Sequence, residues 1–176
     1  ITYFPELDKL NFYLEIIGFN PPIDSAEINP KIWIKIVEII EKNYTKFDGF
    51  VILHGTDTMA YTASAISFML QNLNKPIVFT GSQLPIGVHR TDAKENLITS
   101  IEIAGSRSLG KANVPEVCIY FENQLMRGNR THKSSSNEFN AFSSNNYPIL
   151  ARAGIDINYN QNVISNGALK TLKIHK

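Results

Sequence analysis

Apolar positions along the chain alternate between short strand-like runs and helix-like stripes, and these changes of period mark the expected elements. The apolar run Phe50–Leu53 is typical of a buried strand and stops at a polar turn. From Met59 to about residue 73, apolar residues recur every three or four positions, which predicts a helix. The same order returns as a strand at 77–80 and a helix at 90–104. This alternation favours an α/β fold in three layers, a parallel sheet of the Rossmann or flavodoxin type with helices on both faces.

Further elements are expected on both sides of this centre. Asn29 followed by Pro30 predicts a helix start, because Asn caps helices and proline suits their first position, and the helical pattern continues to about residue 43. Four more segments carry strand or turn-and-strand patterns: 14–17, 117–121, 123–127 and 154–159. Residues 128–147 are polar without a clear period and predict a long loop, and long loops inside compact domains are usually functional.

Composition and charge narrow the class of protein. A length of 176 residues with 43% hydrophobic and 19% charged residues fits one soluble globular domain with a genuine core. The net charge of +1 gives no electrostatic case for binding nucleic acid or an anionic membrane. The single cysteine, Cys118, excludes an internal disulfide and is expected to be an inert core thiol.

The chain shows no membrane-length apolar run and no signal peptide, so the expected compartment is the cytoplasm. It begins at Ile1, without Met, inside a segment that looks structured, and residues 172–176 alternate like a strand cut short. We therefore expect the sequence to be a piece of a longer protein.

Three polar turns are predicted, at 24–25, 56–58 and 81–83. The first follows the two prolines at 21–22, and the other two follow predicted strands. If these turns share the carboxyl edge of the sheet, their hydroxyls and carboxylates form one cluster where ligands bind in such folds. Unpaired N–H groups at the start of the following helix would point at the same place. The alternative is that Asp57 or Thr58 only caps that helix, which is the commonest reason for such residues at a strand-to-helix turn.

The segment 127–133 adds a candidate base, Lys133, two residues after a threonine. A lysine amine beside a threonine hydroxyl can accept its proton where burial or a nearby cation favours the neutral amine. An aspartate within reach would orient the amine, as in a nucleophile–base–orienter triad without histidine. The alternative is a solvated loop lysine.

Other polar residues receive structural interpretations. Arg90 and Asp92 are expected to form a helix cap and a surface pair, with Asp92 and Glu95 close to a capping box. His54, at the end of a buried strand, is expected to be a hydrogen-bonded structural residue. No His, Cys or Asp spacing matches a metal site, and no glycine-rich phosphate loop follows a strand. No metal or cofactor is therefore expected.

Four motifs resemble the amino-terminal domain of the L-asparaginases, and most closely the type I, cytoplasmic bacterial branch. They are His-Gly-Thr-Asp-Thr-Met at 54–59, Phe-Thr-Gly-Ser-Gln-Leu-Pro at 79–85, Arg-Thr-Asp-Ala-Lys-Glu-Asn-Leu at 90–97 and Arg-Gly-Asn-Arg-Thr-His-Lys at 127–133. The resemblance covers about residues 20–160, with the motifs in the family's order.

The resemblance implies roles for five residues. Thr56 is similar to the family's second catalytic threonine, Lys133 to the lysine paired with it, and Asp57 to the acid that completes the triad. Asp57 also resembles the carboxylate that grips the substrate's α-ammonium group, and Thr56 belongs with it in the substrate site. Ser25 resembles the serine that binds the α-carboxylate, and Asp24 precedes it as in type I enzymes. The implied reaction is hydrolysis of L-asparagine to L-aspartate and ammonia by an amidohydrolase that serves asparagine catabolism, without a metal or cofactor.

The chain departs from the family pattern at several points. Ala26 stands where relatives often carry Ser or Gln, and the 176 residues contain no Thr-Gly-Gly-Thr motif for the first catalytic threonine. The lid that follows that motif and the smaller second domain are also missing. We accordingly expect 1–160 to be the family's amino-terminal domain without its first strand and lid, and 161–176 to be a linker and the start of a carboxy-terminal domain.

The intact protein is expected to be a homo-oligomer, a dimer or tetramer, since relatives are usually tetramers. An alternative for this chain is a catalytically silent fragment that binds an amino acid. A regulator built on the same fold is a more distant alternative, because no basic stripe or recognition helix is present.

Overall fold

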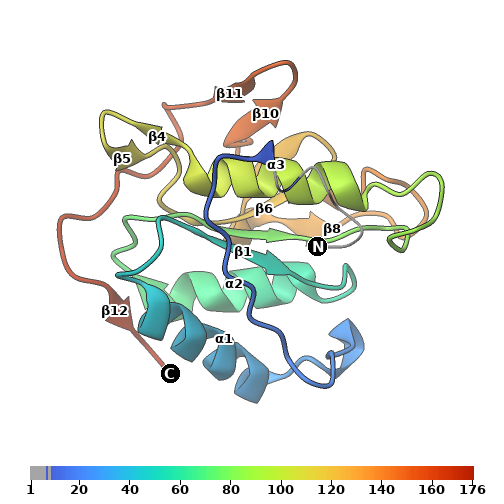
Figure 1. Ribbon diagram of the computed structural model, residues 1–176, viewed down its shortest axis with the longest axis horizontal. Coiled ribbons are helices and arrows are strands. Elements are labelled where there is room, and N and C mark those ends of the chain that lie inside the picture. Colours follow the sequence, from blue (N-terminus) through green and yellow to red (C-terminus); the bar gives the residue numbers. More distant parts are fainter. Residues whose placement is uncertain (1–6, 8) are drawn as a thin grey trace.

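A mixed six-stranded sheet forms the centre of the protein in the computed structural model, which describes residues 7 and 9–176. The expectation that the chain opens inside a structured segment concerns residues outside this range. The strands, in spatial order, are β1 (Phe50–Leu53), β3 (Ile77–Thr80), β6 (Val117–Phe121), β7 (Gln124–Arg127), β10 (Ala151–Ala153) and β11 (Ile157–Tyr159). Three helices pack on it: α1 (Pro30–Asn43), α2 (Met59–Met69) and α3 (Ala93–Gly105). Helices α1 and α2 lie on one side of the strands and α3 on the other, so the predicted three-layer α/β fold is confirmed (Figure 1).

The sheet is parallel in only one half. Strands β1, β3 and β6 pair in parallel, as predicted, whereas β7, β10 and β11 are each antiparallel to their neighbours. The change follows from the two-residue connection between β6 and β7. Glu122 and Asn123 both have positive φ, 45° and 63°, which is the geometry of a tight hairpin turn. A connection this short can only join antiparallel strands.

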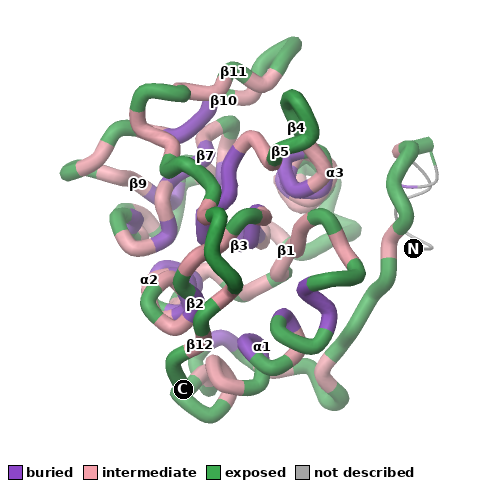
Figure 2. The backbone as a smooth tube through the Cα atoms, turned by 90° about the vertical axis from the view of Figure 1, so that its left-hand side faces the viewer, coloured by how far each residue is buried: buried purple, intermediate pink, exposed green. Residues whose placement is uncertain are grey.

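Side-chain alternation along the central strands supplies the core of both layers. Ile77 and Phe79 pack in the cluster with α1 and α2, while Val78 between them packs in the cluster with α3. Cys118 is fully buried in the α3 layer, and burial raises the pKa of its thiol well above its usual value. The predicted position of Cys118 in the core is confirmed, and the raised pKa gives the physical reason to expect an inert thiol. Figure 2 shows that the buried residues are concentrated in the three helices and in the strands between them.

Capping residues and apolar patterns in the sequence predicted correctly where most helices and strands begin. Asn29 caps α1 by accepting a hydrogen bond from the N–H of Lys31, with Pro30 in the first turn. Helix α2 ends at Met69, earlier than its apolar pattern, because Leu70 is extended and begins β2 (Leu70–Gln71). The run 14–17 forms no strand.

Small elements connect and cover the sheet. β2 pairs with β12 (Lys173–Ile174), so the predicted terminal strand exists and runs antiparallel beside the end of α2. β4 (Arg107–Ser108) pairs with β5 (Lys111–Ala112), and β8 (His132–Lys133) pairs with β9 (Phe142–Ser143) inside the predicted long loop. Two short 3₁₀ turns, η2 (Ser25–Glu27) and η3 (Gly128–Arg130), complete the described elements. Within residues 7 and 9–176, no helix is long and apolar enough to cross a membrane.

Candidate functional site

The carboxyl ends of β1 and β3 bring two of the predicted polar turns together. The strands pair in parallel up to Leu53 and Thr80, so both chains leave the sheet at the same edge. Gly81 follows β3 directly, and a Cβ at this position would lie 2.2 Å from the carbonyl oxygen of His54. Only glycine permits this approach, so the turn at 81–83 is fixed against the turn at 54–58.

The third polar turn, η2, reaches the same edge from a distant part of the sequence. The hydroxyl of Thr58 donates a 2.6 Å hydrogen bond to the carbonyl oxygen of Ser25. A Cβ on Gly55 would lie 2.6 Å from the Ser25 side chain, so these turns are in close contact. Ser25 is buried, whereas Asp24 is exposed and accepts a bond from the N–H of Ala26. Thr58 does occupy the N-cap position of α2, but its side chain makes no capping bond.

Lys133 completes the cluster from the other end of the chain. Its Nζ donates hydrogen bonds to Thr56 Oγ1 at 2.9 Å and to Asp57 Oδ1 at 2.8 Å. The Lys133 side chain is 17% exposed, while that of Asp57 is 70% exposed. Lys133 is therefore held in place, unlike a solvated loop lysine. An ammonium group has three donors, so among the described residues one N–H of Lys133 is left without a partner.

The turn η3 determines where Lys133 stands. Its first residue, Gly128, is buried against α2, where a Cβ would lie 3.1 Å from the carbonyl oxygen of Val117 and 3.2 Å from that of Ala63. Thr131 then donates its hydroxyl to the Arg127 carbonyl oxygen at 2.7 Å, which closes the turn. The chain leaves this turn as β8, with Lys133 directed at the end of β1.

His54 has the predicted structural role. Its Nδ1 lies 2.7 Å from the carbonyl oxygen of Gly55 and its Nε2 lies 2.9 Å from Thr62 Oγ1. Burial lowers the pKa of His54 below its usual value of 6.5, which favours the neutral ring. Because a carbonyl oxygen only accepts, we assign the proton to Nδ1, so that Nε2 accepts from the Thr62 hydroxyl. Thr62 in turn accepts from the Trp33 indole, so His54 joins the end of β1 to α2 and α1.

The expected capping box at Asp92 and Glu95 does not form. Asp92 stands at the N-cap position of α3, yet its carboxylate accepts from the N–H groups of Gln83 and Leu84 and from the amide of Asn96. Glu95 accepts from the Tyr120 hydroxyl at 2.6 Å. The expected surface pair is also absent among the described residues, since Arg90 lies over the ring of Phe139. Long-range partners outcompete the local cap because the turn after β3 presents several unpaired N–H groups to Asp92.

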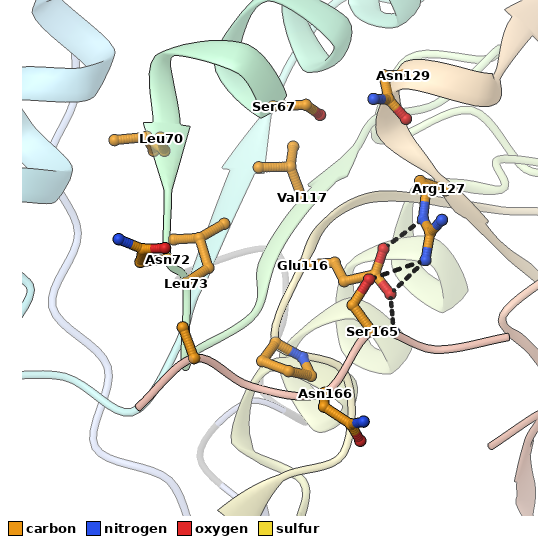
Figure 3. A pocket seen from close by; sticks show the side chains of 12 residues that line it. Ser67, Leu70, Asn72, Leu73, Glu116, Val117, Arg127, Asn129, Ser165 and Asn166 are labelled. Carbon is orange, nitrogen blue, oxygen red and sulfur yellow. Dashed lines mark hydrogen bonds and ion pairs between the residues drawn. The ribbon is translucent and has the colours of Figure 1, made fainter. Parts of the chain in front are cut away.

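The opposite edge of the sheet carries a cavity of about 390 Å³ with a partly buried ion pair on its wall (Figure 3). Arg127 donates to both carboxylate oxygens of Glu116, at 2.5 and 2.9 Å. Sequence reasoning missed this pair. The hairpin register offered a signal, because the two-residue turn places Arg127 opposite Cys118, two positions after Glu116. Within the described part of the chain, no group of three or more His, Cys, Asp or Glu residues could hold a metal ion.

The fold and the cluster define a class of protein: an α/β domain that presents a threonine, an aspartate and a lysine at the carboxyl ends of parallel strands, where such folds bind small ligands. Residues 2–165 match the family model described as asparaginase, N-terminal. The chain therefore belongs to the asparaginase family, and the resemblance seen in the motifs is confirmed.

Individual relatives agree on the family. L-asparaginase 1 of Escherichia coli K12 is 50% identical over 141 residues, which are 79% of this chain and 40% of that protein. The 60 kDa lysophospholipase of Mus musculus is 42% identical over 161 residues, 91% of this chain and 28% of that protein. The crystal structure of L-asparaginase I from Vibrio cholerae matches with a TM-score of 0.82 and 45% identity, and covers 92% of this chain and 48% of that one. The chain thus spans less than half the length of these relatives. Their names denote different activities, so family membership alone does not fix the substrate.

Proposed function

We propose that the protein to which these residues belong hydrolyses L-asparagine to L-aspartate and ammonia, with a threonine as nucleophile in the intact enzyme. The observation that carries this proposal is the position of Lys133 Nζ between Thr56 Oγ1 and Asp57 Oδ1. A hydroxyl, an amine and a carboxylate in one hydrogen-bonded group can move a proton to and from a nucleophile without histidine.

In this proposal the catalytic residues are Thr56, Asp57 and Lys133. The amine of Lys133 in its neutral form takes a proton from the threonine hydroxyl, and Asp57 orients the amine and compensates its charge once it is protonated. Backbone N–H groups at the start of α2 would stabilise the tetrahedral oxyanion of the amide substrate. The family resemblance supports a further threonine, upstream of the described strands, as the primary nucleophile.

The proposed substrate site uses Asp24, Ser25, Thr56 and Asp57. Asp57 is suited to bind the α-ammonium group because most of its side chain is open to solvent while one oxygen holds Lys133. Ser25 lies against Gly55, next to Thr56, and would bind the α-carboxylate. Ala26 offers no polar side chain for a further contact. An amino acid fits this arrangement, because a carboxylate can hold its ammonium group while a hydroxyl binds its carboxylate.

We also propose the division of the chain into an amino-terminal domain at 1–160 and a linker at 161–176. It is supported by the near absence of regular structure after β11, where the short strand β12 returns to β2. The likeness to the type I branch supports a cytoplasmic location and a homo-oligomeric enzyme, a dimer or tetramer. Light scattering on the purified full-length protein would test the oligomeric state.

The proposal is tested by ammonia release from L-asparagine and L-glutamine by the full-length protein, with a parallel arm that supplies a lysophospholipid. We expect ammonia from L-asparagine, and a loss of about 1,000-fold or more in Thr56→Val, since members of a catalytic unit are not replaceable singly. Thr45→Val is the matched control, because Thr45 is exposed in the turn before β1, at the other edge of the sheet. Hydrolysis of the lysophospholipid alone, or equal turnover by Thr56→Val, would overturn the assignment.

A further inference from the structure

The short hairpin that carries Lys133 is connected by a loop, residues 134–141, between β8 and β9. The ladder between the strands is only two residues long, and the hairpin forms a small sheet separate from the six-stranded one. The loop closes on itself where the N–H groups of Ser134 and Ser135 donate to the carbonyl oxygen of Ala141. So short a ladder provides few hydrogen bonds, and contacts from outside the hairpin are needed to fix the position of Lys133.

Gln83 provides such a contact from the turn after β3. Its side-chain amide nitrogen donates to the carbonyl oxygen of Glu138 at 3.0 Å and to that of Ser136 at 3.3 Å. Both acceptors belong to the loop that begins directly after Lys133. One amide group thus joins the turn at 81–84 to the hairpin.

Gln83 is itself held rigidly. Its backbone N–H donates to both carboxylate oxygens of Asp92 at 3.0 Å, and the N–H of Leu84 donates to the same carboxylate at 3.1 Å. Asn96, which is fully buried, donates to the Gly81 carbonyl oxygen and to Asp92. The turn is therefore anchored to α3 at both ends, so that Gln83 extends from a fixed base.

A second contact joins the same two segments. The guanidinium carbon of Arg90 lies 5.8 Å from the centre of the Phe139 ring, within the range of a cation–π interaction. Phe139 is in the loop, next to the residue whose carbonyl oxygen accepts from Gln83. Two independent side chains before α3 therefore hold the hairpin loop.

We propose that Gln83 is a positioning residue for Lys133, an inference that rests on the proposed function of the site. The amide fixes the loop 134–141, and this keeps Lys133 Nζ within hydrogen-bond distance of Thr56 and Asp57. Positioning matters here because a displacement of about 1 Å can cost about 100-fold in rate. A lysine side chain with four rotatable bonds depends on its backbone for such accuracy.

The test compares the full-length wild-type protein with Gln83→Met and Gln83→Glu. Met has a similar length without donors, and the carboxylate of Glu cannot donate to the two carbonyl oxygens, so the second variant serves if the first fails to fold. Gln71→Met is the matched control, because Gln71 is exposed in β2, at the end of α2 opposite to Thr56. We expect kcat for L-asparagine to fall about 10- to 100-fold in both Gln83 variants, with KM changed far less, because Lys133 acts in proton transfer.

A second measurement reads the position of Lys133 without using activity. Reductive methylation followed by mass spectrometry gives the reaction rate of each lysine, with the exposed Lys111 as the internal reference. We expect Lys133 to react several-fold faster in both Gln83 variants than in the wild type and Gln71→Met. Unchanged labelling of Lys133, or faster labelling with an unchanged kcat, would overturn the proposal. If the wild type released no ammonia, the proposed function would fail, and the labelling rates would still decide whether Gln83 positions Lys133.

Discussion

Two ion pairs lie at opposite edges of the sheet and differ in their exposure to solvent. Their cations, Arg127 and Lys133, are six positions apart in the sequence. Arg127 pairs with Glu116 before η3, and Lys133 pairs with Asp57 after it. In the first pair the side chains of Arg127 and Glu116 are 19% and 8% exposed, and in the second those of Lys133 and Asp57 are 17% and 70% exposed. The two cations are thus covered to a similar extent, and the pairs differ in the carboxylate, which is buried in Glu116 and open to solvent in Asp57.

Further neighbours surround the Arg127–Glu116 pair. The guanidinium group also donates to Val163 and Ser165 and lies 4.2 Å from the centre of the Tyr147 ring. Glu116 additionally accepts from the N–H of Ser165 at 2.6 Å. The hydrogen bond to Glu116 raises the pKa of Arg127 further above its already high value. Through these partners the pair connects the end of the β6–β7 hairpin to the chain after β11.

The Lys133–Asp57 pair has hydrogen-bonding groups without a partner among the described residues. Lys133 has two partners for three donors, and the second oxygen of Asp57 has no partner among the described residues. Because the donor–acceptor distances of the two pairs are similar, the exposure of the carboxylate is what separates the candidate site from the structural ion pair.

The largest effect is expected for Lys133→Met in the full-length protein. Loss of the amine should lower kcat for L-asparagine by about 10,000-fold, because a catalytic unit loses most of its rate with one member. Its free energy of unfolding should change by less than about 1 kcal/mol, because the partner Asp57 is solvated. Urea unfolding and ammonia release measure the two quantities, with the exposed-residue variant Lys111→Met as control. A large loss of stability would show that this pair is structural after all.

The reverse result is expected for Glu116→Ala. Removal of the buried Glu116 carboxylate leaves the mostly covered Arg127 charge uncompensated and should cost about 3 kcal/mol in the free energy of unfolding. Asp48→Ala is the matched control, since it breaks the more exposed pair with Arg107 and should cost less than about 1 kcal/mol. Below the unfolding transition, turnover should stay near that of the wild type. Equal stability losses in the two variants would contradict the contrast drawn here.

The smallest effect concerns His54 and the pH dependence of stability. Burial lowers the pKa of His54, so the unfolded state binds its proton more readily than the folded state. The folded state, which keeps the His54 ring neutral, therefore has its full stability above the unfolded pKa of about 6.5. This part of the stability is lost as the pH falls below that value. His54→Gln should therefore lose less stability between about pH 7.5 and pH 5.5 than the wild type, relative to the exposed-residue control His89→Gln. Thermal midpoints at both pH values measure this, and identical pH dependence would exclude the effect.

Sequence patterns predicted the elements whose determinants are local. The apolar runs at β1 and β3 give buried strands, and the sequence Asn29–Pro30 begins α1, because period and capping act within a few residues. The motif residues at the ends of strands were also found, since polar residues that interrupt an apolar pattern are visible along the chain. Thr56 and Asp57 were thus candidates before any fold was known, whereas Lys133, in a polar stretch without a period, was singled out by a nearby threonine and by the family resemblance.

Turn geometry and contacts between residues apart in the sequence decided the rest. The antiparallel half of the sheet depends on the positive φ angles at Glu122 and Asn123, and the role of Asp92 depends on N–H groups of a turn eight to nine positions away. The contact between Lys133 and Thr56 joins residues 77 positions apart. By itself the sequence determined the local period and the side chains available at each turn. The tertiary structure alone decided which polar groups pair and which stay open, because those pairings follow from how the layers pack.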